Sequence, residues 1–456
     1  MNATPAPAPS AAPPLPLRSL GGLPLVGVLP ELQKDPLGVM ERGTLNYGPM
    51  VRMPLPLGVE AFLISEPQLV EHVLVTNSRN YVKQTRGYEM LRKVLGNGLV
   101  TSEGDFWKRQ RRIAQPAFHR ERLFAFGETM TRAATDMVDG WKSGQTFDVA
   151  DAFMRVTLRL VGETLLSSDV TSAASEVGQA ITVALEHLIH RTLHPFSFPE
   201  WVPTPTNLAF KKALHQLDSV VMGMIATRRE GKGPTNDLLA MLMEARDPET
   251  GEGMSDEQLR DEVMTIFLAG HETTANALAW TVMLLGKSPA VEQRLMKELN
   301  EVLGGRVPTM SDVPKLTYTA MVLKESMRLY PPVWSLARRV EEDDVVDGVV
   351  FPKGAIVFIC PYALHRHPKY WKDPEAFDPE RFAADAPPPT KGAYLPFSMG
   401  QRKCIGDTFA MVEAQLVLAT VLQRMHLSLV PGQAFAPEPV ITLRPLGGVK
   451  VVATKR

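Results

Sequence analysis

The stretch FSMGQRKCIG, residues 397–406, is the part of the sequence from which the fold can be predicted. Cys404 lies in this stretch, directly before the apolar, helix-like run at residues 407–425. A thiol at the start of a helix meets unpaired backbone N–H groups and the positive end of the helix dipole. Both favour the thiolate, which is the form that binds metals. We therefore predict that Cys404 is a metal ligand.

The residues around Cys404 suit a large, planar ligand with acidic groups. Gly400 and Gly406 allow such a group to approach the backbone closely, because they carry no side chain. Arg402 offers a guanidinium to an acidic group, and Phe397 could shield the sulfur from solvent. A glycine-rich turn around an inert cysteine is the alternative, but it would not account for the whole pattern.

This pattern resembles the cysteine loop of the cytochrome P450 family, which is Phe, two residues, Gly, one residue, Arg, one residue, Cys, one residue, Gly. Every fixed position is matched at residues 397–406. The resemblance implies the cytochrome P450 fold, which is mainly α with small β-sheets and has a long central helix over the haem. It also implies haem b as cofactor and Cys404 as the axial thiolate ligand, which pushes electron density onto iron.

The composition of the chain favours one large globular unit. Hydrophobic residues make up 45% of the chain and charged residues 22%, a balance that allows a sizeable core. Lys and Arg number 49 against 50 Asp and Glu, so the net charge of -1 gives no reason to expect nucleic acid or an anionic membrane as a partner. Because no clean linker divides the sequence, we predict that residues 21–456 form a single, monomeric catalytic domain.

Residues 1–20 differ in composition from the rest of the chain. They contain six prolines and no long apolar run, so we expect a disordered tail rather than a signal peptide or a membrane anchor. The chain has only two cysteines, and Cys360 lies in an apolar strand where a packing role is expected. These features predict a cytoplasmic protein, similar to the soluble bacterial members of the family.

The longest helix is expected to begin after Ser255 and to run to residue 286. Ser255 is a suitable N-cap, and Gln258 three residues later completes a capping box. Pro289 would end the helix, because proline cannot continue it. The middle of the helix, residues 263–269, is apolar on nearly all sides and must therefore be buried.

The sequence AGHETT, residues 269–274, interrupts this apolar helix. A buried Glu272 is costly unless protons are needed there, and Gly270 would allow a local bulge where a ligand could sit. AGHETT resembles the family's oxygen-activation motif, which implies that Thr273 holds oxygen and water while Glu272 relays protons. A threonine that satisfies its own helix carbonyl is the alternative. His271 is expected to be structural.

Several basic residues are candidates for binding the haem propionates. Trp107 and Arg111 lie four apart on one helical face, and the family uses such a pair on a propionate. A core tryptophan at a solvated basic helix end is the alternative. The resemblance assigns Arg338 to the second propionate, with Arg339 as its rival, and adds Arg402 from the cysteine loop.

The electrons must come from separate proteins, because the sequence contains no flavin, iron–sulfur or dinucleotide motif. The resemblance implies a ferredoxin or flavodoxin-type electron donor with its reductase. Lys108, Arg109 and Arg112 point away from the propionate candidates and form a possible cationic surface for an acidic donor.

A structural charge cluster is implied by two further motifs. KESMR contains Glu325 and Arg328 on one helical face, and DPERF contains Arg381. An isolated i,i+3 pair would be weak evidence, because such pairs occur on many exposed helices. The family forms a buried Glu, Arg, Arg cluster from these positions to support the haem loop.

Candidates for the substrate pocket come from segments that are apolar or that match the family's pocket. The stretch at residues 194–207 resembles the family's gating segment, with a proline-rich connector holding core aromatics as the alternative. Residues 438–456 are expected to form a C-terminal hairpin. The pocket candidates are Leu95, Ala269, Val333, Leu336 and Ile441.

Together these features predict a haem-thiolate monooxygenase that hydroxylates or epoxidises an apolar small molecule with O2 and two electrons. The motif sequences are similar to those of fatty-acid-hydroxylating branches of the family. The first hairpin, however, carries Glu60 rather than a basic residue that could hold a carboxylate. Terpenoids, steroids and polyketides are the alternative substrates. A peroxygenase would not need the proton relay of Glu272 and Thr273, and neither would a haem sensor.

Overall fold

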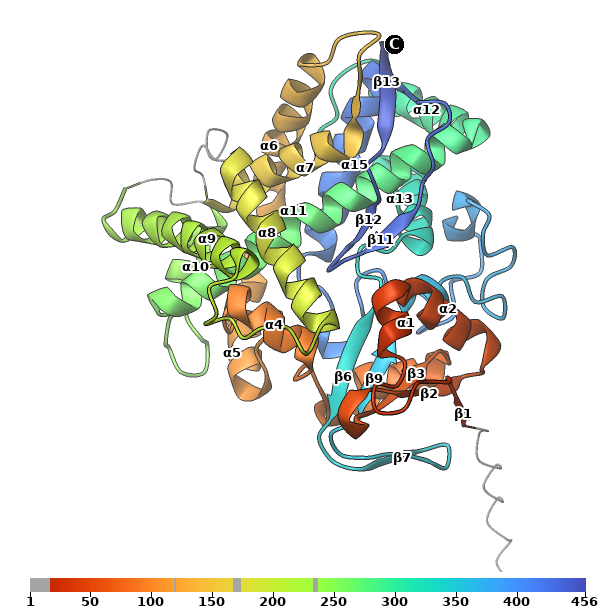
Figure 1. The fold of residues 1–456 in the computed structure, drawn as a ribbon. Helices are drawn as coiled ribbons and strands as arrows, with labels where there is room; N and C mark the ends of the chain where they lie inside the picture. Colours follow the sequence, from red (N-terminus) through yellow and green to blue (C-terminus); the bar gives the residue numbers. More distant parts are fainter. Residues whose placement is uncertain (1–16, 119, 167–173, 233–236) are drawn as a thin grey trace, which may run out of the picture.

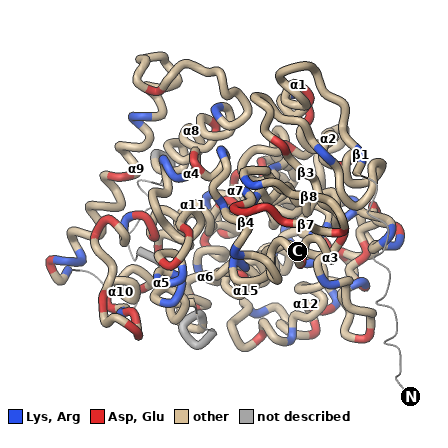
Figure 2. Tube along the Cα trace, turned by 90° about the horizontal axis from the view of Figure 1, so that it is seen from below, with Lys and Arg blue, Asp and Glu red and all other residues tan. Residues whose placement is uncertain are grey.

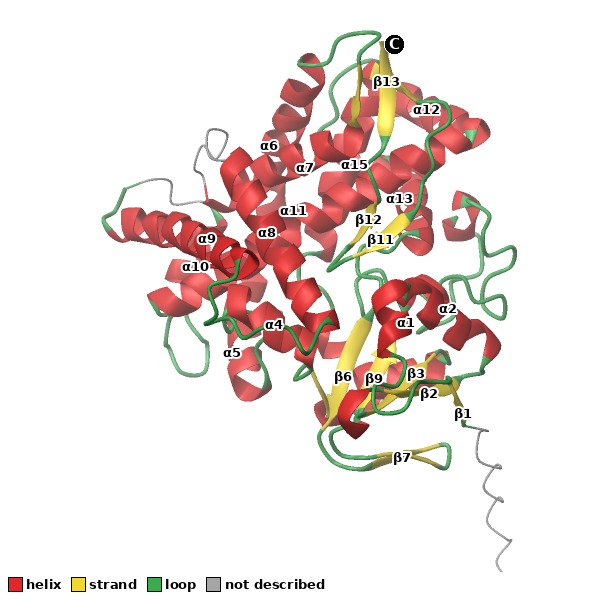
Figure 3. Cartoon of the chain, in the orientation of Figure 1, coloured by secondary structure: helices red, strands yellow, loops and turns green. Residues whose placement is uncertain are grey.

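The computed structural model describes residues 17–118, 120–166, 174–232 and 237–456. Helices form most of the molecule, and the strands gather mainly beside α1 and α2 and near the C-terminus (Figures 1 and 3). The described strands form one six-stranded sheet, one three-stranded sheet and two two-stranded sheets. The predicted fold class, mainly α with small sheets, is therefore confirmed.

The helices and strands have the following bounds. The helices are α1 (Leu29–Lys34), α2 (Pro36–Asn46), α3 (Pro67–Glu71), α4 (Arg86–Leu95), α5 (Gly104–Ala114), α6 (Arg120–Asp139), α7 (Val149–Val161), α8 (Ala174–Leu193), α9 (Pro205–Arg229), α10 (Leu238–Glu244), α11 (Asp256–Lys287), α12 (Pro289–Leu303), α13 (Thr317–Leu329), α14 (Pro361–Leu364) and α15 (Asp407–Arg424). The strands are β1 (Arg18–Ser19), β2 (Met50–Pro54), β3 (Glu60–Ile64), β4 (Tyr81–Val82), β5 (Thr146–Asp148), β6 (Leu336–Val340), β7 (Asp344–Val346), β8 (Val349–Phe351), β9 (Ile356–Ile359), β10 (Met425–Leu429), β11 (Pro437–Pro439), β12 (Leu443–Pro445) and β13 (Lys450–Lys455).

The helix α11 is the central element of the fold. It has 32 residues, which corresponds to about 48 Å at 1.5 Å per residue, and it runs from the side of α9 and α10 to that of α12 (Figure 1). Its N-terminus carries the predicted capping box, because Ser255 and Gln258 each accept a hydrogen bond from the other's backbone N–H. The helices α7, α9, α13 and α15 pack around it, so most of its side chains are buried.

The six-stranded sheet has the order β1-β2-β3-β9-β6-β4. Its β2–β3 hairpin pairs Met50 with Ile64 at one end and Pro54 with Glu60 at the other. Strand β1 pairs with β2 and Leu20 is buried, so the predicted disordered tail was wrong for residues 18–20. Leu20 belongs to a core cluster with Val51, Met53 and Leu63 of the β2–β3 hairpin, which explains this order. Residues 1–16 lie outside the described part of the chain.

The C-terminal segment forms two separate pairings rather than the single hairpin that was predicted. Strands β11 and β12 form a hairpin in which Glu438 faces Arg444. Strand β13 instead pairs with β10 and with β5, because Val451 and Ala453 are buried in the large helical core. The alternation of apolar residues indicated these strands but not their partners.

The capping box of α11 leads to a prediction about stability. Replacing Ser255 by Ala should lower the free energy of unfolding by about 1 kcal/mol, because the backbone N–H of Gln258 loses its acceptor. Urea unfolding followed by circular dichroism would measure the change. Ser288→Ala is the matched control, because Ser288 is the N-cap of α12 but makes no side-chain cap bond. Equal losses in the two variants would contradict the capping argument.

Candidate active site

Cys404 lies in a tight loop between a 3-10 turn at Gly400–Arg402 and the first turn of α15. Its backbone N–H donates to the carbonyl of Phe397 at 3.0 Å. Gly400 has a φ of +71°, and a Cβ atom there would lie 2.1 Å from the carbonyl oxygen of Leu74. This glycine is therefore required by the approach of two backbone segments. Gly406 differs, since the nearest atom to its Cβ position is 3.9 Å away.

The Cys404 thiol is accessible to solvent, although protein surrounds it on most sides. These two facts agree if the sulfur lies at the floor of an open cavity. Burial raises the pKa of the thiol, and the N–H of Gly406 with the cations of Arg111 and Lys403 opposes the rise only in part. The backbone N–H at the helix start thus favours the thiolate, but its effect on the pKa is smaller than that of burial. A bound metal cation would supply the missing stabilisation.

Three small residues interrupt the burial of α11. Ala269 is exposed, and Gly270 and Thr273 are partly accessible, whereas the residues on either side of this segment are buried. The helix is continuous here, so the bulge predicted at Gly270 is absent; instead, its missing side chain leaves room for Val161 of α7. The hydroxyl of Thr273 donates to the carbonyl of Ala269 at 2.7 Å. The accessible face is therefore lined by small side chains.

Glu272 directly precedes Thr273 on α11 but is buried. Its Oε1 accepts a hydrogen bond from the hydroxyl of Thr442 at 2.7 Å. Burial raises the pKa of the Glu272 carboxyl, while the Thr442 bond and the charge of Arg444 act against the rise. His271 is buried too, and its Nδ1 donates to the carbonyl of Phe267 at 3.0 Å, with burial lowering its pKa to about 4. A structural His271 agrees with these contacts.

Arg402 and Trp107 meet at the edge of the cysteine loop. The guanidinium of Arg402 lies 3.9 Å from the centre of the Trp107 ring, in a cation–π arrangement. Arg402 also pairs with Glu103 and donates to the carbonyl of Ser102 at 2.7 Å. Its Nη1 is buried and has no hydrogen-bond partner among the described residues. A buried cationic nitrogen without a hydrogen-bond partner is suited to bind an acidic ligand.

A second group of cations faces Arg402. Arg338 is buried and close enough to Arg402 for the two charges to repel each other, whereas its rival Arg339 bonds to Gln84 and Glu341 at 2.6 Å each. The propionate role of Arg338 stays a prediction. Lys83, which the sequence analysis missed, is also buried and donates to a backbone carbonyl at 3.1 Å. Burial lowers the pKa of Lys83 well below its usual value, and repulsion by Arg338 and Arg402 adds to the effect.

The apolar residues predicted to line the substrate pocket lie in different parts of the structure. Leu95 and Trp107 belong to the same core cluster as residues 263–268 of α11, and Ile405 and Ile441 pack against that cluster. Val333 is partly exposed. The segment around it is hydrogen-bonded to the β11–β12 hairpin, because the backbone N–H of Leu443 donates to the carbonyl of Pro332 at 2.9 Å. Leu336 belongs instead to the core of the six-stranded sheet. Their contact with a substrate stays a prediction.

Comparison with known proteins identifies the family. The pattern of the family described as Cytochrome P450 matches residues 17–447. Cyclooctatin synthase of Streptomyces melanosporofaciens is 38% identical over 427 residues, which cover 93% of this chain and 92% of that protein. Pentalenene oxygenase of Streptomyces avermitilis is 33% identical over 425 residues, covering 93% of this chain and 94% of that protein. The chain belongs to the cytochrome P450 family.

Membership establishes the class of reaction. This P450 is a haem b monooxygenase that uses O2, takes electrons from redox partners and acts on a hydrophobic substrate. The residues described above fit the haem: an accessible sulfur, an unpartnered buried nitrogen of Arg402 and an excess of buried cations suit its iron and its two propionates. Among the described residues, no helix is both long and apolar enough to cross a membrane.

Arg111 has a different contact from the one expected in this P450. Its Nη1 donates to the carbonyl of Lys403 at 3.0 Å, so it braces the cysteine loop from α5. It also lies close enough to Cys404 for its charge to act on the sulfur. Phe397 is half-buried in the same loop. The propionate role of Arg111 and the shielding role of Phe397 stay predictions.

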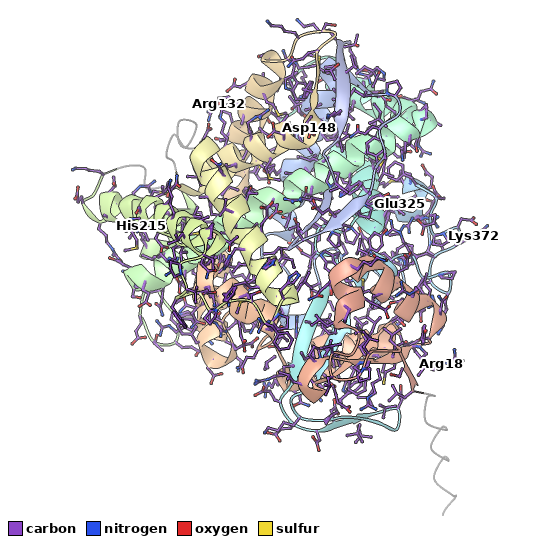
Figure 4. The ribbon with its side chains drawn as sticks, viewed as in Figure 1. Arg18, Arg132, Asp148, His215, Glu325 and Lys372 are labelled. Atoms are coloured by element: carbon purple, nitrogen blue, oxygen red, sulfur yellow. The ribbon has the colours of Figure 1, made fainter. Side chains whose placement is uncertain are left out.

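The predicted cluster of Glu325, Arg328 and Arg381 assembles as a buried network (Figure 4 labels Glu325). Arg328 donates to Glu325 at 2.7 and 2.8 Å, and Arg381 donates to it at 3.2 Å. The network extends through the buried His365, whose Nδ1 donates to the Arg328 carbonyl and whose Nε2 accepts from Leu395 N–H at 2.8 Å. Because Leu395 precedes the cysteine loop, the network connects α13 to that loop.

The cationic surface predicted on α5 is neutralised within the chain. Arg112 pairs with Glu249 at 2.9 Å and with the fully buried Asp247 at 3.2 Å. Arg109 pairs with Glu252 at 3.0 Å. Figure 2 shows charges of both signs around α5 and α10. The prediction of a free cationic surface at these two arginines was therefore wrong, because residues 247–252 are distant in sequence and fold onto α5.

The connector between α8 and α9 exposes its aromatic residues. Phe196, Phe198 and Trp201 have 73%, 71% and 78% of their surface accessible. The alternative that these aromatics belong to the core is therefore wrong. Thr204 caps the following helix by accepting from Asn207 N–H. Whether this segment gates the substrate channel stays a prediction.

The buried charge network yields a prediction about haem incorporation. Glu325→Ala should abolish stable haem incorporation, because two arginines would be left as uncompensated charges in the core. The ratio of haem absorbance to protein in the purified variant would measure it. Glu301→Ala is the control, since the exposed Lys297–Glu301 pair spans 3.9 Å and contributes little. A Glu325→Ala variant with a full haem complement would refute the proposed support.

Proposed function

We propose that this P450 oxygenates a neutral terpenoid, with Cys404 as the haem ligand and Glu272 with Thr273 as the proton route. When bound, the haem supplies the activation of O2. The observation that carries the site assignment is the interrupted burial of α11: small accessible residues follow one another where an acid is buried beside them. A helix in a protein core has no structural need for this combination.

Cys404 would hold the iron through its sulfur, and the cations would hold the propionates. Arg402, with its free Nη1, and the buried Arg338 are the principal candidates, and Lys83 joins them. The ring of Trp107 keeps the Arg402 guanidinium in place through the cation–π contact. The negative charge of Glu103 offsets the mutual repulsion of these cations while no haem is bound.

Thr273 and Glu272 would move protons at the accessible face of α11. The hydroxyl proton of Thr273 is committed to the Ala269 carbonyl, so its oxygen remains free to accept a hydrogen bond from water or substrate. Because its pKa is raised, the Glu272 carboxyl takes up a proton more readily than an exposed carboxyl. An acid that can be protonated beside an accepting hydroxyl supports the monooxygenase over a peroxygenase or a haem sensor.

A terpenoid substrate is supported by the relatives and by one ion pair. Cyclooctatin and pentalenene, which name two of the relatives, are terpenoids. A fatty acid would need a cation for its carboxylate, but Arg52 of the first hairpin is paired with Glu60. The apolar cluster around Leu95 and Ile441 suits a hydrocarbon skeleton. We therefore prefer the terpenoid alternative to the fatty acids.

The electron donor is proposed to be a ferredoxin or a flavodoxin with its reductase. Of the three α5 cations, Arg109 and Arg112 are paired with the acidic loop, and Lys108 bonds to Asp105 at 2.7 Å. Lys403 beside the haem ligand is half exposed and pairs with Asp407. An acidic donor would therefore have to compete with carboxylates of this chain. A cytoplasmic location, with both cysteines free, completes the proposal.

The thiolate assignment is tested by the spectrum of the reduced, carbon-monoxide-bound protein. The wild-type protein should show the Soret band of thiolate-ligated haem, and Cys404→Ala should lose it, because no other sulfur is expected to replace the ligand. Cys360→Ala is the matched control, since Cys360 is buried in the sheet region and burial raises its pKa to about 12. A thiolate spectrum in Cys404→Ala would defeat the assignment.

The substrate class is tested by a binding screen. Terpene hydrocarbons and terpene alcohols should shift the haem spectrum at concentrations about tenfold lower than fatty acids of equal carbon number, because the carboxylate would have to be desolvated. Steroids and polyketides serve as the comparison sets. Equal or tighter binding of fatty acids would show that the substrate class is wrong while leaving the monooxygenase intact.

A further inference from the structure

The turn between β11 and β12 presents neighbouring residues to different parts of the site. Ile441 packs against the apolar cluster around α11, whereas Thr442 is 4% exposed and faces Glu272. Neither the motifs nor the comparisons assign a role to Thr442. Its position is of interest because, among the described residues, its side chain is the only one that is hydrogen-bonded to the buried acid.

The hydrogen bond to Glu272 has a defined direction. Asn276, one turn further along α11, donates from Nδ2 to the Thr442 oxygen at 3.0 Å. The Thr442 hydroxyl in turn donates to Oε1 of Glu272 at 2.7 Å. A hydroxyl that accepts from one side donates more strongly on the other, because linked hydrogen bonds polarise each other. The amide therefore directs the hydroxyl proton toward the carboxyl.

The turn itself is held firmly against α11. The indole N–H of Trp280 donates to the Leu443 carbonyl at 2.9 Å, and the indole N–H of Trp334 donates to the Val440 carbonyl at 2.9 Å. Both bonds flank Thr442 in the chain. These two bonds hold the backbone of Thr442 in place, so its hydroxyl is positioned within reach of Glu272.

The charges near Glu272 come from two other elements. Arg444 of β12 acts on the carboxyl from a distance, and it is itself paired with Glu438 at 2.6 Å and with Glu186 of α8 at 3.4 Å. The neighbouring His271 is neutral at ordinary pH, because burial lowers its pKa. Thr442 is therefore the group in direct contact, and the charged groups act from a distance.

We propose that Thr442, supported by Asn276, is a positioning residue that fixes the Glu272 carboxyl for proton transfer at the accessible face of α11. This inference rests on the proposed proton role of Glu272. Thr442 does not touch the substrate or the cofactor in this proposal; it acts through the acid. Its removal should therefore alter the delivery of protons more than the binding of substrate.

The sign of the pH effect follows from the direction of the bond. A donor to the carboxyl stabilises the ionised form, so losing the Thr442 hydroxyl should raise the pKa of Glu272. A hydrogen bond to a charged group contributes enough to shift the titration by about one pH unit. The carboxylic-acid carbonyl band in the infrared spectrum of the resting holoenzyme would measure this midpoint without any turnover. Glu272→Gln identifies the band by removing it.

The test compares Thr442→Val with Thr442→Ser. The valine variant should show the raised midpoint and a product yield per reductant consumed that is about tenfold lower, with substrate affinity nearly unchanged. The serine variant should restore both values, because it keeps the hydroxyl. Thr281→Val is the control, since Thr281 is buried on the same helix but donates to the Ala277 carbonyl. It should behave like the wild type.

The outcomes separate this inference from the proposed function. If Glu272→Gln leaves the product yield intact, the proton role of Glu272 is wrong, and the positioning role falls with it. If Glu272→Gln lowers the yield but Thr442→Val changes neither the midpoint nor the yield, only the positioning role is overturned. A serine variant as defective as the valine variant would overturn it as well.

Discussion

The burial of α11 along nearly its whole length is the constraint on which the rest of the structure depends. A helix of 32 residues can remain in a core only if neighbouring elements cover almost every side, and α7, α9, α13 and α15 do so. The cost of placing Glu272 there is high, so the acid requires a polar partner. The accessible segment at Ala269 and Thr273 is the exception to this burial, and we propose that the reason is chemical rather than structural.

The cations near the cysteine loop follow the same physical rule. Lys83, Arg338 and Arg402 are buried or half-buried within one region, and Glu103 is the carboxylate paired with Arg402 there. Buried like charges repel one another unless an opposite charge is supplied. The two propionates of haem b are suited to supply it. In the proposed site, electrostatics would favour cofactor binding in addition to the sulfur of Cys404.

The cysteine loop is connected by hydrogen bonds to residues far away in the sequence. Glu325 and Arg328 lie on α13, Arg381 follows much later, and His365 transmits their arrangement to Leu395. The side-chain nitrogen and oxygen atoms of the fully buried Glu325, Arg328 and His365 all have hydrogen-bond partners, as buried polar groups require. The β11–β12 turn makes a comparable contact with α11, where Thr442 donates a hydrogen bond to Glu272. Both sets of hydrogen bonds hold a group to which we assign a role in the reaction.

Local sequence patterns did not predict which of several possible partners a side chain contacts. The propionate candidates Arg338 and Arg339 could not be distinguished by spacing, and only the bonds of Arg339 to Gln84 and Glu341 separated them. The α5 arginines looked free because their acidic partners follow more than a hundred residues later. Thr442 carried no recognisable signal, since a threonine in a turn is common and its contact with Glu272 spans 170 positions.

The sequence by itself determined the family, the class of fold, the capped central helix and the residues of the cysteine and AGHETT motifs. These depend on composition, on short spacings and on periodicity, which act between neighbours in the chain. The tertiary structure decided which cations face the site, which arginines are neutralised, how the C-terminal strands pair and what holds Glu272. Those outcomes depend on the desolvation of charges and on long-range hydrogen bonds, which exist only after distant segments have packed together.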